Sequence, residues 1–468
     1  MLFNSFSFLV LVLVTMLFYY TPRLARYQIG VLIASSLFFY AYNQPLLVLL
    51  LLFSVSINIV SSYYVVYGKP ENKKLMATLG VVLNLSILAF FKYSPLLAST
   101  FLGTTSSVGE FLLTLPLPIG ISFFTFQGIS LVIDVYQEKY FKAKEMVPVS
   151  FYDHARRILF FKGFFPQLIS GPIVKAHDFL PQIEVKTFKA INWEAVFKDL
   201  VVGYFLKMVV ADNLKDYTSW ISYPHFESFS SFTLAVMLWG YSCQIFADFA
   251  GYSLIAIGLA KLFGYDFKQN FNFPYISTSF KDFWKRWHIS LSSFLMEYLY
   301  FPLGGNKKGK VRTYLNLMIV MFLGGLWHGA AWSYAVWGSF HGLALAVERF
   351  LSDKISIKEN VVIKLLKGAM VLGFVTLAWL LFKLPDFSHV IGYCKCLINS
   401  RAPYNDYKFI VLISVYSGFV VLYHLAYLIK STPLFVPFKR VEYLFYGLMF
   451  FLIIVNSGSS GAFIYFQF

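Results

Sequence analysis

The sequence contains few charged residues and few cysteines for its length. Only 13% of its 468 residues are charged, whereas 58% are hydrophobic. A soluble chain of this length would form two or three domains, and so apolar a composition argues against that arrangement. The three cysteines do not make a disulfide framework, and Cys394 and Cys396 lie too close in sequence for an easy bridge. The sequence is therefore typical neither of a soluble multidomain protein nor of a disulfide-rich one.

The sequence also lacks the motifs of several soluble enzyme classes. It has no His-Glu-x-x-His motif, and His328 and His341 are thirteen residues apart, on different faces of an unbroken helix. It has no Gly-x-Ser-x-Gly nucleophile elbow. Residues 304–310 have the Gly-x-x-x-x-Gly-Lys spacing of a phosphate-binding loop, but Val311 stands where that loop needs Ser or Thr. These observations argue against a metal site, a hydrolase-type nucleophile and a P-loop, and we find no nucleic-acid-binding motif.

Long apolar runs take the place of these features. Runs of membrane-spanning length recur from residue 6 to residue 455, and the mean hydropathy is +0.65. This pattern predicts an all-α polytopic membrane protein of about 11–12 transmembrane helices with further re-entrant and interfacial helices. We expect one crossing in the apolar stretch that opens at Pro116. The other expected crossings are at about 5–20, 28–42, 46–67, 75–97, 196–211, 232–263, 313–327, 331–349, 361–383, 408–429 and 441–456.

The net charge of +16 comes mainly from short loops between the apolar runs. Cytoplasmic loops of membrane proteins carry an excess of Lys and Arg, so this charge reports topology rather than nucleic-acid binding. Arg23 and Arg26 follow the first apolar run, which reverses the order expected of a signal peptide. Lys69, Lys73 and Lys74 then mark a cytoplasmic loop. We therefore expect both termini on the extracytoplasmic side of the membrane.

Three segments break the pattern of simple crossings. Residues 138–157 are basic and amphipathic, and we expect them at the cytoplasmic surface. Residues 158–173 are interrupted by glycine and proline, which predicts a re-entrant segment because broken backbone at membrane depth must line protein or a cavity. Residues 264–312 are rich in basic and aromatic side chains and should form a cytoplasm-facing insertion. The polar residues after Pro116, Asp134 among them, must be buried in protein.

Two histidines lie in the apolar segment 324–342. An ionisable side chain at membrane depth is costly, so it faces protein or a water-filled cavity and is a functional candidate. Histidine is also the side chain best suited to move a proton near neutral pH. The glycines beside His328 let backbone or substrate come close to its ring. We expect His328 to act in function and His341 to tie two helices together through its ring nitrogens.

Basic residues within 285–312 have two interpretations. They can mark a cytoplasmic loop, or they can attract the phosphates of a phosphorylated cytoplasmic donor. Lys207, inside an expected span, is a weaker candidate for this role, because a lysine there usually snorkels or pairs, here with Asp212. The residues expected to bind the donor are Lys285, Arg286, Lys307, Lys308 and Lys310.

The sequence around His328 resembles the signature of the membrane-bound O-acyltransferase (MBOAT) family, in its alginate O-acetyltransferase branch. It runs Gly-Leu-Trp-His-Gly at 325–329, followed by Trp337-Gly338 and His341-Gly342. Six further segments resemble the same branch in the same order, so the resemblance covers nearly the whole chain. They are FFPQLISGPI (164–173), DFAGYS (248–253), NFNFPY (270–275), DFWKRWHISLS (282–292), YFPLGG (300–305) and FIYFQF (463–468).

The resemblance implies a bacterial inner-membrane enzyme that takes acetyl from cytoplasmic acetyl-CoA and holds no bound cofactor. It implies a central chamber that contains His328 and His288. By residue type alone, His288 beside Trp287 would be an interfacial anchor. The acetyl group would end on an extracytoplasmic polysaccharide, alginate-like or peptidoglycan-like, with the help of a separate hydrolase-fold (SGNH-like) partner.

Acyl transfer from a thioester needs a base for the attacking hydroxyl and a partner for the developing oxyanion. His328 can be the base. Trp327, His288 or a backbone amide beside Gly325 or Gly329 can stabilise the oxyanion, and the sequence leaves these alternatives open.

Two other functions also remain open. A transporter or flippase of a lipid-linked saccharide would have broken helices and buried polar residues too. The sequence has no internal repeat, and acidic residues such as Asp134 and Asp248 are scarce within the expected spans, which argues against a transporter. A related acyltransferase would instead D-alanylate teichoic acid or acylate a protein.

The last residues, 457–468, form a tail whose first part, Ser457–Gly461, is expected to be flexible. Tyr465 can be an aromatic anchor at the interface. The ending also resembles the C-terminal hexapeptide of the same branch and the companion peptides of D-alanylation systems, which implies that Tyr465 carries the acyl group as an ester. We expect one membrane domain over 1–468, made of N-terminal spans (1–137), a catalytic core (138–350), C-terminal spans (351–456) and the tail (457–468).

Overall fold

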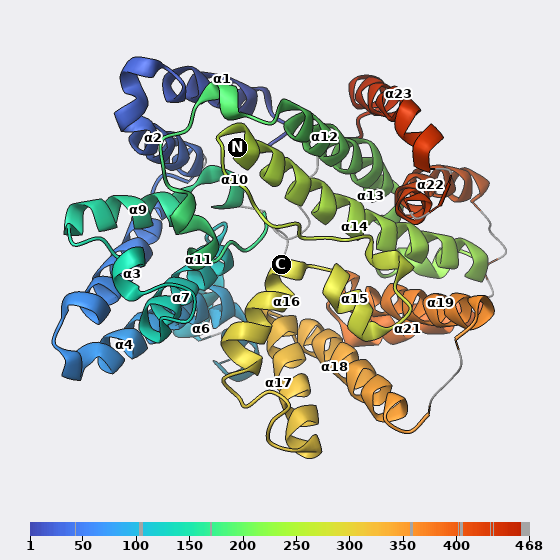
Figure 1. Cartoon of the computed structure of the whole chain (residues 1–468). Coiled ribbons are helices and arrows are strands. Elements are labelled where there is room, and N and C mark those ends of the chain that lie inside the picture. The colour runs from blue at the N-terminus through green and yellow to red at the C-terminus, as the bar shows by residue number, and fades with distance from the viewer. Residues whose placement is uncertain are drawn as a thin grey trace. The chain divides into compact units, whose positions relative to one another are not determined.

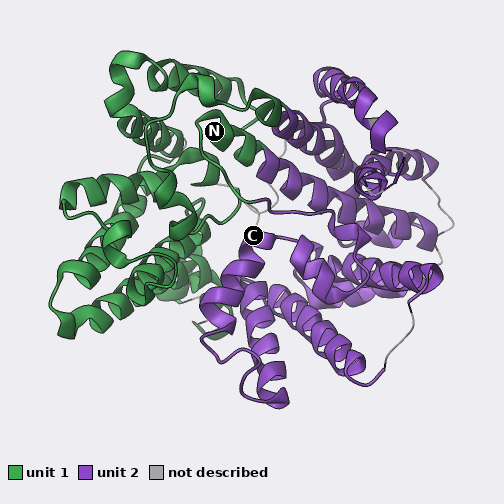
Figure 2. Ribbon diagram, in the orientation of Figure 1, with its two compact units in different colours: residues 1–197, 255–268 green, residues 198–254, 269–468 purple. Residues whose placement is uncertain are grey.

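The computed structural model describes residues 1–42, 44–102, 106–168, 171–355, 359–400, 402, 406–430, 432–433 and 435–459. Every regular element within these residues is a helix (Figure 1), which confirms the all-α prediction. The chain divides into two compact units (Figure 2), one of residues 1–197 and 255–268 and one of residues 198–254 and 269–468. The single membrane domain expected from the sequence remains a prediction.

Six helices among the described residues are long and apolar enough to cross a membrane. The expected runs 361–383 and 408–429 correspond to Val361–Lys383 and Tyr407–Ile429. An uninterrupted apolar run stays helical because its backbone groups find no other partner in lipid. The larger total expected from the sequence remains a prediction, since the expected crossings outside these six helices fall on shorter or less apolar ones. The other four apolar helices are Pro22–Ala41, Leu47–Tyr67, Pro70–Leu102 and Ser231–Leu262.

The first unit is built around α3, which packs against α4, α7 and α9. Its elements in chain order are α1 (Phe6–Tyr19), η1 (Pro22–Tyr27), α2 (Gln28–Ala41), α3 (Leu47–Tyr67), η2 (Pro70–Asn72), α4 (Lys73–Leu88), η3 (Ala89–Tyr93), α5 (Ser94–Leu97), η4 (Ala98–Leu102), α6 (Ser107–Thr114), α7 (Ile121–Gln137), α8 (Ala143–Met146), α9 (Phe151–Gly163), α10 (Phe165–Leu168), α11 (Ala176–Phe179), η5 (Leu180–Gln182), η6 (Phe188–Ala190) and the start of α12 (Trp193–Tyr204).

Polar side chains on α3 join it to its neighbours. Asn58 Nδ2 donates to Asn84 Oδ1 on α4 over 3.2 Å, and Asn84 Nδ2 donates back to Asn58 Oδ1 over 3.0 Å. Lys162 Nζ on α9 donates to the Ser54 hydroxyl over 2.8 Å. Gly128 on α7 lies so close to α3 that a Cβ there would be 2.5 Å from Asn58 Oδ1. These bonds hold the helices together, because a buried polar group away from water needs a protein partner.

The helices α7 and α9 test two predictions made for this unit. Most of α7 is buried, Asp134 included, which confirms that the polar residues of this stretch lie inside protein. The expected surface segment 138–157 and the expected re-entrant segment 158–173 share one helix, since α9 runs from Phe151 to Gly163, and their placement at the membrane remains a prediction. Ser150 caps that helix by accepting a hydrogen bond from Asp153 N over 3.3 Å, and no glycine or proline interrupts it earlier. After α9 the chain is broken as predicted, although its re-entry into the membrane remains a prediction.

The second unit is built on residues 231–254 of α14, and 89% of the apolar span of that helix is buried. The remaining elements are the end of α12, η7 (Phe205–Ala211), α13 (Asp212–Thr218), η8 (His225–Ser228), α14 (Ser231–Leu262), η9 (Pro274–Ile276), α15 (Phe280–Arg286), α16 (Ile289–Leu295), η10 (Met296–Tyr300), α17 (Lys310–His328), α18 (Trp332–Ser352), α19 (Val361–Ala378), α20 (Leu380–Lys383), α21 (Phe387–Asn399), α22 (Tyr407–Ile429) and α23 (Phe435–Val455).

A buried ion cluster joins η7 and α13 to α14. Lys207 Nζ lies 2.7 Å from Asp212 Oδ1 and 2.7 Å from Asp248 Oδ1, and all three side chains are at most 3% exposed. The Tyr252 ring centroid lies 5.1 Å from the same nitrogen. The expected pairing of Lys207 with Asp212 is therefore confirmed, and Asp248 is a second partner that the sequence did not reveal. The cluster places the start of α13 beside the middle of α14.

Candidate active site

His288 lies at a break between α15 and α16. Ser279 caps α15 by accepting a hydrogen bond from Asp282 N over 3.0 Å, and the helix ends at Arg286. His288 then takes a φ of 44°, in the left-handed region that a non-glycine residue seldom adopts. Such a conformation persists only where the surroundings hold it. The surrounding structure therefore holds His288 in a strained backbone conformation, which fixes the position of its side chain.

Asn270 holds the break in place. Its carbonyl oxygen accepts a hydrogen bond from Ile289 N over 2.8 Å, and its side-chain Oδ1 accepts one from Ser290 Oγ over 2.8 Å. The same Oδ1 lies 3.2 Å from His288 Nδ1, and Asn270 Nδ2 donates to Ser253 Oγ over 3.0 Å. An amide oxygen only accepts, so Nδ1 of His288 carries the proton and Nε2 is the basic nitrogen.

His328 is the last residue of α17, and it is 3% exposed. Its ring centroid lies 5.1 Å from that of Trp327, 5.2 Å from that of Trp337 and 5.3 Å from that of Phe382. The ring centroid of His288 lies 6.1 Å away. The structure therefore brings the two histidines together within one buried aromatic shell. Both rings are buried, and a neutral imidazole can accept a proton at its unprotonated nitrogen.

Glycines set the approach of α18 to the end of α17. A Cβ on Gly325 would lie 2.2 Å from Tyr334 O, and a Cβ on Gly338 would lie 2.1 Å from Met321 O. A Cβ on Gly329 would lie 2.2 Å from the Tyr334 ring. The glycines beside His328 thus allow two helices to pack backbone to backbone, which fixes the position of its ring.

The sequence predicted that His341 ties two helices together through its ring nitrogens, and this prediction is wrong. The side chain is fully buried. Neither ring nitrogen has a hydrogen-bond partner among the described residues. Its ring packs instead against aromatic rings, with centroid distances of 4.7 Å to Trp337 and 5.2 Å to Trp284. The sequence could not distinguish these two roles, since both need only a histidine on an apolar helix face.

Trp337 is a site residue whose chemistry was not recognised in the sequence. Its indole lies between the rings of His328 and His341, and Trp337 is 1% exposed. Its Nε1–H has no acceptor among the residues that the structure describes. A buried donor beside the proposed base is suited to stabilise an oxyanion. Asn270 and Ser253 were also missed as site residues, although both lie in motifs that carried the resemblance.

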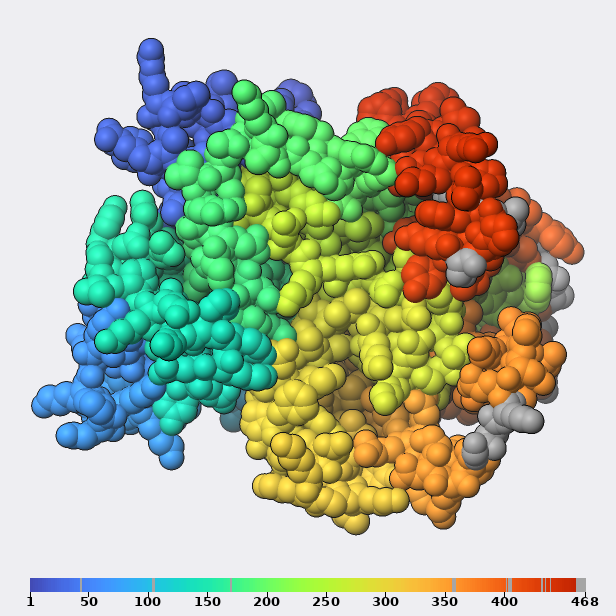
Figure 3. All heavy atoms as spheres, viewed as in Figure 1, coloured from blue at the N-terminus to red at the C-terminus, as the bar shows by residue number. Residues whose placement is uncertain are grey.

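The expected donor-binding residues are more exposed to solvent than the two histidines. Lys285, Lys307, Lys308 and Lys310 are exposed, and the yellow part of the chain, around residue 300, forms part of the visible surface in Figure 3. Lys310 Nζ lies 3.1 Å from Asp353 Oδ2, an exposed pair.

Arg286 is half-buried and has structural contacts. Its Nε donates to Asp282 Oδ2 over 2.9 Å, and Nη1 donates to Asn272 O over 3.2 Å. Arg286 therefore stabilises the loop that holds His288. For this reason we do not group it with the four exposed lysines as a donor-binding residue.

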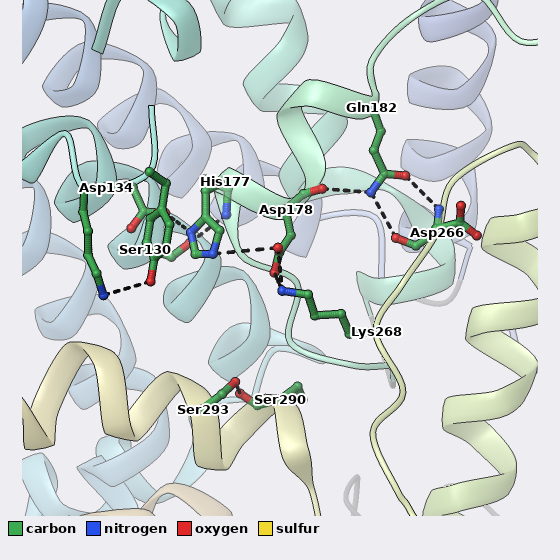
Figure 4. Close-up of polar contacts among 12 residues, drawn as sticks. Ser130, Asp134, His177, Asp178, Gln182, Asp266, Lys268, Ser290 and Ser293 are labelled. Carbon is green, nitrogen blue, oxygen red and sulfur yellow. Dashed lines mark hydrogen bonds and ion pairs between the residues drawn. The ribbon is translucent and has the colours of Figure 1, made fainter. Parts of the chain in front are cut away.

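A second polar cluster lies in the first unit (Figure 4). His177 Nδ1 lies 2.8 Å from Asp134 Oδ2, and His177 Nε2 lies 3.8 Å from Asp178 Oδ1. Lys268 Nζ donates to both carboxylate oxygens of Asp178 over 2.7 and 2.8 Å, and the Tyr140 ring stacks on His177 with centroids 3.7 Å apart. These contacts satisfy Asp134, whose burial the sequence predicted without naming its partner.

Among the described residues no group of three or more His, Cys, Asp or Glu side chains could hold a metal ion. Tyr465 lies outside the described residues, as does the rest of 460–468. Its expected role as an acyl carrier therefore remains a prediction.

Comparison with known proteins decides the family. The family model of the membrane-bound O-acyltransferases matches residues 100–385. The chain is 35% identical to a peptidoglycan O-acetyltransferase of Helicobacter pylori over 79% of this chain and 73% of that protein. It is 36% identical to a probable alginate O-acetylase of Azotobacter vinelandii, over 81% of this chain and 74% of that protein. The chain belongs to the membrane-bound O-acyltransferase family.

Family membership gives the buried histidines a chemical context. Both His288 and His328 lie inside the matched region, and so do Asn270 and Trp337. The chain is similar at a lower level to a teichoic acid D-alanyltransferase of Bacillus subtilis, with 28% identity over 50% of this chain and 59% of that protein. A multi-pass membrane O-acyltransferase explains the six apolar helices. A soluble enzyme or a nucleic-acid-binding protein does not.

Proposed function

We propose that this acyltransferase moves an acetyl group from cytoplasmic acetyl-CoA toward an extracytoplasmic polysaccharide, with His328 as the catalytic base. The approach of the His328 and His288 rings to 6.1 Å inside a buried aromatic shell carries the proposal. The two relatives named above for acetyl transfer to peptidoglycan and alginate support acetyl as the group and a polysaccharide as the acceptor. The chain would lie in a bacterial inner membrane with both termini outside the cytoplasm.

The chemistry requires one base and one oxyanion partner. His328 takes the proton of the attacking hydroxyl, whose oxygen bonds to the thioester carbonyl carbon. The carbon–sulfur bond then breaks, and the departing thiolate receives the proton from His328, so the base is regenerated. Trp337 Nε1–H suits the oxyanion better than His288, because the bond between His288 Nδ1 and Asn270 leaves Nε2 as an acceptor.

Tyr465 is our proposed first acceptor. Its phenol oxygen would take the acetyl group as an aryl ester, which is reactive enough to serve as an intermediate. A serine of a separate hydrolase-fold (SGNH-like) partner would then attack this ester, and the tyrosine would recover its proton. The proposed carrier is consistent with the tail lying outside the cytoplasm, the side on which the polysaccharide lies.

A direct assay distinguishes the proposed acyltransferase from the alternative, a transporter of a lipid-linked saccharide. Purified protein in detergent, given acetyl-CoA and no ion gradient, is expected to release free coenzyme A thiol. A transporter would leave the thioester intact under these conditions. Thiol release no faster than in protein-free detergent would contradict the proposed function, and D-alanyl donors offered in parallel test the nature of the acyl group.

We further propose that Lys285, Lys307, Lys308 and Lys310 attract the phosphates of the donor. Charge reversal at Lys307, Lys308 and Lys310 together should raise the Michaelis constant for acetyl-CoA about tenfold. A tenfold rise corresponds to about 1.4 kcal/mol, and exposed ion pairs contribute up to about 1 kcal/mol each, so the loss of at least two of the three attractions is needed to reach it. The measurement is initial rate against acetyl-CoA concentration at low ionic strength, where screening is weak.

The matched control reverses three other lysines: Lys69 in the connection between α3 and α4, and Lys73 and Lys74 at the start of α4. It makes the same change in net charge on the side of the membrane predicted to be cytoplasmic. If the Michaelis constant for acetyl-CoA rises equally in both triple variants, or in neither, the lysines at 307–310 do not bind the donor and only mark a cytoplasmic loop.

A further inference from the structure

The side-chain amide of Asn270 has one orientation that satisfies its neighbours. Its Oδ1 lies 3.2 Å from the backbone nitrogen of Ser290. A backbone N–H only donates, so the amide atom that faces it is the oxygen. The other end of the amide, Nδ2, donates to Ser253 Oγ on α14 over 3.0 Å. Both side chains are buried, so protein groups on its two sides fix the orientation of the amide.

This fixed amide sets the protonation pattern of His288. Asn270 Oδ1 lies 3.2 Å from His288 Nδ1 and also accepts a hydrogen bond from Ser290 Oγ over 2.8 Å. An amide oxygen carries neither a proton nor a formal charge, so it accepts the Nδ1–H of a neutral imidazole. The lone pair of the ring is then on Nε2. The bond therefore selects one neutral tautomer of His288.

One helix, α14, holds His288 from two directions. Phe249 and Ser253 are four residues apart on α14, so their side chains lie on the same face of the helix. Phe249 places its ring edge-on to His288 with centroids 4.6 Å apart, and Ser253 holds the amide that bonds to Nδ1. The helix is itself fixed by the ion pair between Asp248 and Lys207. Both the packing and the tautomer of His288 therefore depend on α14.

The charge of His288 matters because another titratable ring packs against it. The ring of His328, on α17, has its centroid 6.1 Å away. A positive charge at this distance inside protein opposes the protonation of His328. The basic residues before His288 point elsewhere, since Lys285 is exposed and Arg286 is paired with Asp282. The other rings that contact His288 carry no charge, namely Phe249, Phe271 and Trp327.

We propose that Asn270 is a positioning residue that keeps His288 neutral in its Nδ1–H tautomer, and that this neutrality lets His328 act as the base. The proposal rests on the function proposed above for His328. An amide suits this role, because a carboxylate in its place would favour the imidazolium form of His288. That charge would oppose the proton that His328 takes from the attacking hydroxyl. Ser253 supports the role by fixing which end of the amide faces the ring.

The variant Asn270→Asp tests the charge. Its carboxylate can accept the same hydrogen bonds from Ser290 and His288, and the Ser253 hydroxyl can rotate to donate to it. The negative charge should raise the pKa of His288 by about one unit or more, so this ring stays protonated to a higher pH. The active form needs a neutral His288, so kcat is lost as the pH falls through the raised pKa. The acidic limb of the profile of kcat against pH should therefore move to higher pH, measured by thiol release from acetyl-CoA.

Asn84→Asp is the matched control for the pH profile. Asn84 on α4 is also fully buried, and its Nδ2 donates to Asn58 Oδ1 over 3.0 Å and to Gly80 O over 2.7 Å. The same chemical change there should lower the yield and leave the acidic limb where the wild type has it. An unmoved limb in Asn270→Asp, or an equal movement in both variants, would overturn the proposal. Thiol release by the wild type in the same assay would leave the proposed function standing.

A double-variant cycle separates positioning from support of the fold. Asn270→Ala should lower kcat about ten- to hundredfold with an unchanged Michaelis constant for acetyl-CoA, because the ring of His288 is no longer held. In the His288→Ala background the same change should cause no further loss. An equal proportional loss in both backgrounds would mean that Asn270 acts only through the fold, and it would refute the positioning role. Full activity of His288→Ala would refute it as well.

The ring nitrogens of His288 report the tautomer without turnover. The measurement is magic-angle-spinning NMR of the protein in lipid, labelled with ¹⁵N at histidine, with the His288 signals identified as those that His288→Gln removes. At neutral pH the wild type should show a protonated Nδ1 and an unprotonated Nε2. Asn270→Ala should lose this preference, whereas Asn84→Ala should keep it. A protonated Nε2 in the wild type, or the same tautomer in Asn270→Ala, would overturn the proposal whatever the activities are.

Discussion

Replacement of His328 by alanine is expected to abolish acetyl transfer while the protein remains folded and inserted. General acid–base catalysis contributes about 10²–10⁴-fold, so the rate should fall by about that factor. The ring packs against the neighbouring rings of Trp327 and Trp337, whereas the close crossing of α17 and α18 is made by glycines. The contacts of Gly325 and Gly338, which set the crossing of α17 and α18, remain. The measurement is thiol release from acetyl-CoA and acetyl on the polymer, at matched membrane levels.

Two other histidines serve as comparisons. His341→Ala removes an equally buried ring that has no hydrogen-bond partner among the described residues, so it should lower yield and leave turnover per folded molecule near normal. His288→Ala should impair turnover less than His328→Ala, since His288 supports the site rather than accepting the first proton. Normal acetylation by His328→Ala would refute its role as the base.

Replacement of Lys207 by methionine is expected to cost about 3–5 kcal/mol of folding free energy. The change leaves Asp212 and Asp248, both at most 3% exposed, facing each other without the cation that lies 2.7 Å from each. Removing one partner of a buried ion pair is costly at this scale because an uncompensated charge remains. Methionine keeps most of the volume of the lysine stem, so packing changes little. The measurement is thermal unfolding in detergent, followed by the monomer peak in size-exclusion chromatography.

Lys198→Met is the matched control for this prediction. Lys198 Nζ lies 2.8 Å from Glu442 Oε1, but the two side chains are 26% and 19% exposed. Solvent screens such a pair, and its loss should cost about 1 kcal/mol or less. If Lys207→Met unfolds at the same temperature as Lys198→Met, the buried cluster does not stabilise the second unit. Lys207→Met combined with Asp248→Asn should recover part of the loss, because it removes one of the two carboxylates.

Local features of the chain were predicted well because short-range physics decides them. The apolar runs at 361–383 and 408–429 correspond to helices because their composition and length are sufficient for a span. Asp134 had to be buried with a partner, and it is. That α9 joins the end of the expected surface segment to the start of the expected re-entrant segment follows from the Ser150 cap and from the lack of glycine or proline before Gly163.

Contacts between distant segments were beyond prediction from residue patterns. Nothing in the spacing of Asn270 and His288 indicates that one amide oxygen holds a left-handed histidine and its neighbouring serine. The same holds for Asp248 as a partner of Lys207, and for Met208 as the acceptor of Gly458 N. Each depends on which helix faces meet, and many pairings of apolar helices satisfy the same hydropathy pattern.

By itself the sequence determined that the protein is helical and membrane-spanning, and that His328 is the residue best suited to move a proton. Those conclusions follow from run length, composition and the cost of an ionisable group in an apolar segment. Only the tertiary structure decided that His288 lies beside His328, that His341 packs without a hydrogen bond among the described residues, and that Gly458 N donates to Met208 O of η7. The reason is that side-chain burial and hydrogen bonding in a helical bundle depend on which helices pack together, and glycine contacts such as that of Gly325 with Gly338 set how closely they pack.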